Sequence, residues 1–138
     1  MTAPLDDPDD LHALAAIAMG HAFDSLPPRG ALMPFALVEG PHGRQLHRAV
    51  ADRLEEMLAR TREVVASAGD LTRAVVVYDG YMNLGGRRTD AIFVDAYEGG
   101  AAGGILIGQP YGTVGLLKKK RAPLGSGGIV ARDRPPLF

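Results

Sequence analysis

Two carboxylates, Asp79 and Asp90, are the residues of this chain whose type and spacing best suit a chemical reaction. They lie in two runs rich in valine and tyrosine that flank a turn sequence at residues 83–86, a pattern typical of a β-hairpin. If Leu84 and Gly85 form the tip of that hairpin, Asp79 lies directly opposite Asp90. Like charges in this position repel, so we expect a cation, a basic neighbour or a shared proton between them.

This pair has a functional and a structural interpretation. In the first, Asp79 and Asp90 bind Mg²⁺ or Mn²⁺, since hard cations prefer carboxylate oxygens. The chain would then be a divalent-metal- or carboxylate-dependent enzyme, hydrolase or nuclease-like. Arg88 completes the catalytic candidates, because it lies two residues from Asp90 on the same strand face and pairs with Tyr81 in this register. In the second, the same residues form an Asp–Arg surface patch, as structural ion pairs often do, or the two strands pair in a different register. We prefer the second.

The order of elements resembles that of the restriction-endonuclease-like nucleases in one respect. A predicted helix that carries Glu55 and Glu56 precedes a β meander that carries Asp90. The chemistry of that family also needs an acidic residue and a lysine, one residue apart, on the following strand. Here that strand reads ILIGQPY, with neither a lysine nor a carboxylate. The chain departs from the family's pattern at the residues that its chemistry requires.

Other catalytic and cofactor motifs are missing. The chain has no cysteine, which excludes thiolate metal sites and thiol nucleophiles. None of its serines lies in a G-x-S-x-G motif. The glycine-rich segments at 99–104 and 125–128 have neither the Gly-Lys-Ser/Thr ending nor the following helix of a phosphate-binding loop. We therefore expect no cofactor and favour a non-enzymatic domain.

The charges nearly cancel, because 15 Lys and Arg stand against 16 Asp and Glu, for a net charge of −1. Residues 118–121, Lys-Lys-Lys-Arg, are the single basic run, interpreted either as a phosphate-contacting strip or as an edge that lysine keeps soluble. We favour the second and expect no nucleic-acid partner. No apolar run approaches the ~18 residues of a membrane span, and the acidic start lacks the features of a secretory signal. We expect a cytoplasmic protein with no membrane contact.

Two helices are predicted from the apolar spacing. The first is capped by Asp9 or Asp10, has no charge over residues 11–23 and ends before Pro27. Because it is apolar on most sides, the core or a second subunit must cover it. The second helix spans residues 45–68, with one apolar and one charged side.

The remaining segments have strand patterns. A strand over 31–39 contains Pro34, which favours a sheet edge because proline has no N–H for the ladder. The other predicted strands are residues 73–82, 87–97, a run from 105 that Pro110 interrupts, 113–120 and 129–130. Residues 75–77 are all valine, so apolar groups point to both sheet faces. The first helix, the chain end or a second subunit must therefore cover the second face.

These elements predict an α+β fold in the order α-β-α-β-β-β(-β), with a four- or five-stranded, mostly antiparallel sheet and two helices. We expect a disordered acidic tail over 1–8, a single domain over 9–131 and a C-terminal tail over 132–138. The preferred function is a non-enzymatic binding or assembly domain that acts through self-association or a protein partner. We expect a homo-oligomer, a dimer in the simplest case, since large apolar patches rarely stay exposed.

Overall fold

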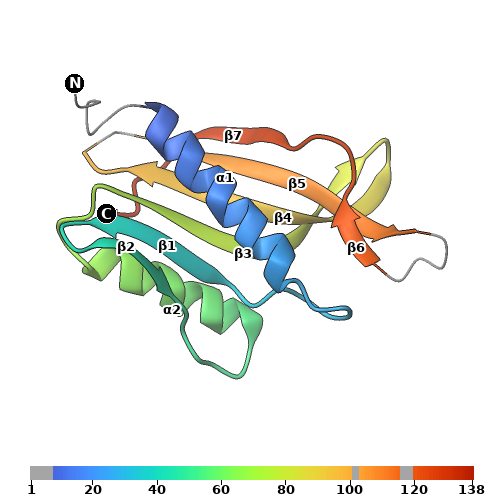
Figure 1. Ribbon diagram of the computed structural model, residues 1–138, viewed down its shortest axis with the longest axis horizontal. Helices are drawn as coiled ribbons and strands as arrows, with labels where there is room; N and C mark the ends of the chain where they lie inside the picture. Colours follow the sequence, from blue (N-terminus) through green and yellow to red (C-terminus); the bar gives the residue numbers. More distant parts are fainter. Residues whose placement is uncertain (1–7, 101–102, 116–119) are drawn as a thin grey trace.

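Seven strands form one antiparallel sheet, with two helices packed on it, among the residues that the computed structural model describes, 8–100, 103–115 and 120–138 (Figure 1). The elements in chain order are α1 (Pro8–Ser25), β1 (Phe35–Gly40), β2 (Gly43–His47), α2 (Leu54–Ser67), β3 (Arg73–Leu84), β4 (Arg87–Glu98), β5 (Gly104–Val114), β6 (Lys120–Pro123) and β7 (Gly128–Arg134). The strand order is β2-β1-β3-β4-β5-β6, and β7 also pairs with β5. The predicted α+β fold is confirmed, with more strands than the four or five expected.

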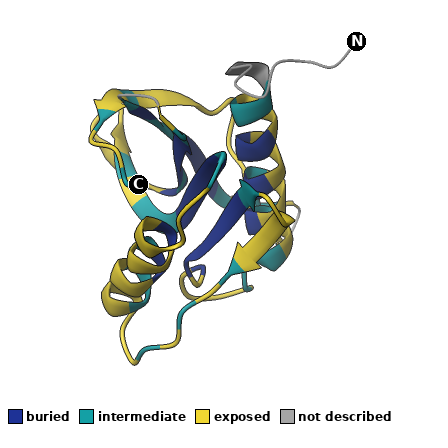
Figure 2. Ribbon diagram, turned by 90° about the vertical axis from the view of Figure 1, so that its left-hand side faces the viewer, coloured by how far each residue is buried: buried dark blue, intermediate teal, exposed yellow. Residues whose placement is uncertain are grey.

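The central strands of the sheet are buried on both faces. Val75 and Val77 point to one face and Val76 to the other, and all three are fully buried. The first face is covered by buried side chains of α1, namely Leu14, Ala15, Ala18 and Ala22. The second is covered by Leu58 and Val65 of α2 together with Leu137 and Phe138. Figure 2 shows the two helices on opposite sides of the buried strands, so one chain covers both faces by itself.

The structure corrects the start of the predicted helix over residues 45–68. Residues 43–47 instead form β2, which turns back after Gly40 and pairs antiparallel with β1, and α2 begins at Leu54. Val50, which lies within the predicted helix, belongs to no helix and is 85% exposed. The tight turn at residues 40–43 decides the outcome, because it brings residues 43–47 beside a backbone that can satisfy their hydrogen bonds.

Two prolines lie where a strand needs no backbone donor. Pro34 precedes β1 and takes no part in its ladders. β1 is an interior strand between β2 and β3, so the predicted edge position is wrong. The predicted interruption at Pro110 is also wrong, since β5 runs through it. The paired residues of β7 reach Gly108 and those of β6 begin at Tyr111. Pro110 lies in the gap between these two ladders, where its missing N–H is not required.

The predicted chain ends fall partly on residues that the structure does not describe. Residues 1–7 of the expected acidic tail lie outside the described residues, as do 116–119 of the expected strand over 113–120. Pro8 begins α1, and residues 132–134 belong to β7. Within the described part of the chain, neither helix is long and apolar enough to cross a membrane.

A buried carboxylate joins α2 and β7 to the centre of the sheet. Asp95 of β4 is completely buried and lies between two arginines. Arg62 of α2 donates a hydrogen bond of 2.9 Å to Asp95, and Arg134 of β7 donates two, of 3.1 and 3.0 Å. A buried carboxylate is tolerated because such charge-assisted bonds replace its lost hydration.

The Asp95→Ala variant should lower the free energy of unfolding by about 3 kcal/mol, because both arginines lose their buried partner. This figure is at the low end for a buried ion pair, since the two arginine side chains are 26% and 33% exposed and reach water. Urea denaturation measures the loss. The matched control is Asp52→Ala, which removes an exposed carboxylate and should change stability by less than about 0.5 kcal/mol. Equal effects of the two substitutions would contradict the role given to Asp95.

Candidate functional site

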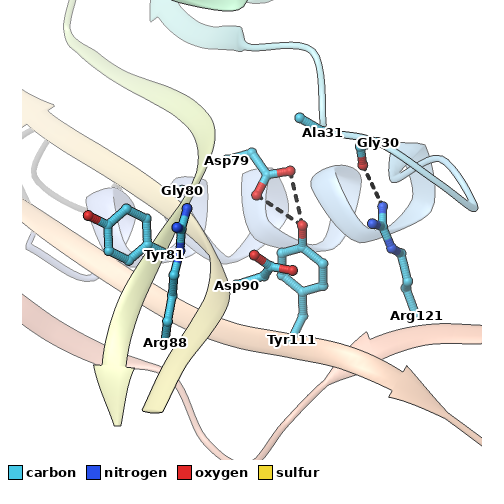
Figure 3. A pocket seen from close by; sticks show the side chains of 9 residues that line it. All are labelled: Gly30, Ala31, Asp79, Gly80, Tyr81, Arg88, Asp90, Tyr111 and Arg121. Atoms are coloured by element: carbon cyan, nitrogen blue, oxygen red, sulfur yellow. Dashed lines mark hydrogen bonds between the residues drawn. The ribbon is translucent and has the colours of Figure 1, made fainter. Parts of the chain in front are cut away.

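Both predicted carboxylates line one open depression of about 240 Å³ on the face of the sheet that carries α1. Figure 3 shows Asp79 and Asp90 close to each other in this depression, with Tyr111 beside them. The other lining residues are Gly30, Ala31, Gly80, Tyr81, Arg88 and Arg121. The sequence therefore identified two acidic residues that the fold does bring together.

The register between β3 and β4 differs from the predicted one. The turn consists of Gly85 and Gly86, both with positive φ (57° and 80°), and Asp79 pairs with Ile92 while Asp90 pairs with Tyr81. Asp79 and Asp90 are therefore diagonal neighbours and do not lie directly opposite each other. The observed register differs from the predicted one by two residues. Side chains two residues apart point to the same face of a strand, so Asp79 and Asp90 still share a face. The reason is that two consecutive residues with positive φ suit a type I′ turn.

Asp79 is engaged in the fold. Its carboxylate accepts a hydrogen bond of 2.8 Å from the backbone N–H of Leu32, in the segment between α1 and β1. The hydroxyl of Tyr111 on β5 lies 3.0 Å from each carboxylate oxygen and donates to them. One side chain of β3 thus connects to an adjoining loop and to a strand two positions away in the sheet. We call these hydrogen bonds of Asp79 with Leu32 and Tyr111 the clasp, because they hold three parts of the fold together.

Burial raises the pKa of the Tyr111 phenol well above its ordinary value, and the hydrogen bond to Asp79 raises the pKa further. The negative charges of Asp79 and Asp90 act in the same direction, whereas Arg121 opposes them. The tyrosine is therefore a proton donor held in its neutral form at physiological pH. A general base would need the opposite shift.

The two arginines of the depression differ in their roles. Arg88 stacks on Tyr81, with its guanidinium 4.0 Å from the ring centroid, although the observed strand register pairs Arg88 with Asn83. Arg121 donates hydrogen bonds to the carbonyls of Pro27 and Gly30, at 2.9 and 2.6 Å, so it holds the loop that follows α1. Its guanidinium also lies 5.6 Å from the centroid of the Tyr111 ring. The sequence interpretation missed Tyr111 and Arg121 as members of this cluster.

The carboxylate of Asp79 already has a structural role in this depression. Asp79 already accepts hydrogen bonds from an amide and a phenol, and two guanidinium groups line the same depression. Among the residues that the structure describes, no group of three or more His, Cys, Asp and Glu side chains is placed to hold a metal ion. The candidate catalytic set Asp79, Asp90 and Arg88 is thus assembled in space, but its central carboxylate connects three parts of the fold.

Comparison with known proteins adds no assignment: no protein family, no curated protein and no solved structure matches this chain.

The Tyr111→Phe variant tests the clasp. Removing the hydroxyl should lower the free energy of unfolding by about 1.5 kcal/mol at pH 7, since the lost bond joins a phenol to a carboxylate. The pKa of Tyr111 is raised in the folded state, so the stabilisation is complete below the unfolded pKa of about 10 and declines as the pH rises above it. The stability difference between wild type and variant should therefore narrow above about pH 10.

Urea denaturation from neutral to alkaline pH measures this difference. Tyr78 and Tyr97, whose pKa values are also raised by burial, are present in both proteins and cancel in the comparison. A stability gap that stays constant through the alkaline range, or no gap at neutral pH, would contradict the clasp.

Proposed function

We propose that this chain is a non-enzymatic binding or assembly domain that acts through self-association, and that it works in the cytoplasm. The observation that carries the proposal is an open sheet edge. β2 pairs with β1 on one side, and no described strand lies on its other side. Residues 43–46 are exposed and His47 is partly so. An edge of this kind offers a row of unpaired backbone groups to another chain.

The argument for self-association does not rest on α1. Its apolar side chains are covered by the sheet, and Ile17, 44% exposed, is the large apolar residue that it leaves in water. The faces of the sheet are likewise covered within one chain. A second copy can instead pair with an edge strand, whose backbone binds a partner without a large apolar patch.

A nucleic-acid partner is not part of the proposal. Lys118 and Lys119 lie outside the described residues, and Arg121 is bound to two loop carbonyls. A net charge of −1 also provides no long-range attraction for phosphates. The absence of cysteine fits a reducing compartment, which supports the proposed cytoplasmic location.

Multi-angle light scattering should give about twice the chain mass of 14.6 kDa as the concentration rises from micromolar to millimolar. The dimer should be in reversible exchange with the monomer, because a short edge strand supplies few contacts. A constant monomer mass over the whole range would overturn the proposal that the domain acts through self-association.

The alternative, a divalent-metal- or carboxylate-dependent enzyme, has one observation in its favour: Asp79 and Asp90 share a depression. A metal bound to the native state would raise the melting temperature by mass action. We expect no increase with millimolar Mg²⁺ or Mn²⁺, because Asp79 is already hydrogen-bonded to Leu32 and Tyr111. A clear increase that is lost in Asp90→Asn would favour the enzyme instead.

A further inference from the structure

We propose that two copies of this chain pair through β2, antiparallel and about a twofold axis at Gln45. The inference rests on the proposed self-association and adds the surface, the partner and the register. The two sheets would then join edge to edge into one continuous sheet, with α1 of both copies on one face and α2 of both copies on the other.

The direction of the backbone groups in β1 fixes the direction of those in β2. The carbonyl of Glu39 accepts a hydrogen bond of 2.7 Å from the N–H of Thr72, which directly precedes β3. Backbone groups of successive residues in a strand point to opposite sides, so the alternate β1 residues Ala36, Val38 and Gly40 point to β2. Their register partners in β2 are His47, Gln45 and Gly43.

It follows that Arg44 and Leu46 direct their N–H and C=O groups away from β1, toward the open edge. Two such residues, two positions apart with Gln45 between them, suit pairing of the strand with itself. With Gln45 on the twofold axis, Arg44 of one copy lies opposite Leu46 of the other, and the reverse. Each of these two pairs exchanges both of its backbone hydrogen bonds, which gives about four between the copies.

The other outer strands carry features that discourage such pairing, and β2 lacks them. β6 begins with Lys120 and ends with Pro123, and both residue types discourage edge pairing. β7 has register shifts along β5, and Pro135 follows its last residue. β2 contains no proline and no lysine, and its register with β1 is continuous.

The side chains around β2 are also compatible with a second copy. Arg44 forms an ion pair of 3.2 Å with Glu39. This pair partly neutralises the positive charge with which Arg44 would repel Arg44 of the second copy. Leu46 is 40% exposed, and Val50, just beyond the strand, is 85% exposed. Both offer apolar surface that a partner can cover. The net charge of −1 leaves little long-range repulsion between copies.

A single cysteine tests the register directly, because the chain contains none. In the proposed dimer, Gln45 of one copy lies opposite Gln45 of the other as a non-hydrogen-bonded pair. The Cβ atoms of such a pair lie about 4.5–5.5 Å apart. This separation is close to that of a disulfide. Gln45→Cys should therefore form a covalent dimer under mild oxidation. The control is Ser67→Cys, which places an exposed thiol on α2 and should give only background cross-linking. Equal cross-linking of the two variants would overturn the inference.

A proline tests the edge without relying on cysteine chemistry. Leu46→Pro removes a donor that points to the open edge and leaves the β1–β2 ladder intact. It should weaken the dimer about tenfold or more, since each copy loses one hydrogen bond. The control Leu46→Ala keeps the donor and should weaken the dimer less. Unchanged circular dichroism and urea midpoint establish that Leu46→Pro is folded.

The outcomes separate the two proposals. A wild-type protein that is monomeric in light scattering contradicts self-association itself. A wild-type dimer that neither cross-links through Gln45→Cys nor weakens with Leu46→Pro contradicts the β2 interface and leaves self-association standing. Cross-linking at residue 45 together with dissociation by Leu46→Pro supports both.

Discussion

The structure depends on one constraint: its central strands carry apolar side chains on both faces. Val75, Val76 and Val77 can all be buried only if something covers each face of the sheet. α1 provides one cover, and α2 with Leu137 and Phe138 provides the other. With both faces covered, the large apolar side chains that stay exposed lie elsewhere, among them Val50, Leu46 and Met33. We propose that the molecule binds a partner through the backbone of its edge strand β2.

The acidic residues follow from the same constraint. A helix on each face must be connected to the sheet, and the connecting loops leave backbone donors that need partners. Asp79 meets this need for Leu32, with Tyr111 as a second donor, while Asp95 binds Arg62 and Arg134 on the opposite face. Asp79 and Asp95 thus each bind groups from other elements of the fold. The interaction surface that we propose is β2.

Sequence patterns predicted those parts of the fold that depend on local physics. Proline and apolar spacing delimit α1, and the paired glycines at 85 and 86 mark the hairpin of β3 and β4, although its tip was placed one residue early. β2 was missed because Leu46 and Val50, four residues apart, fit a helical stripe that continues into α2. Only the distant pairing with β1 decides between helix and strand there. Tyr111 and Arg121 were missed because their neighbours in the depression come from other strands and loops.

Residue-resolved amide hydrogen exchange at several protein concentrations tests the central claim most directly. Gln45 and His47 donate to β1, so their amides should be protected at every concentration. The amides of Arg44 and Leu46 point to the open edge, so they should exchange rapidly in dilute solution and become protected as the concentration rises. Rapid exchange of Arg44 and Leu46 at all concentrations, in a protein that light scattering shows to be dimeric, would contradict the β2 interface.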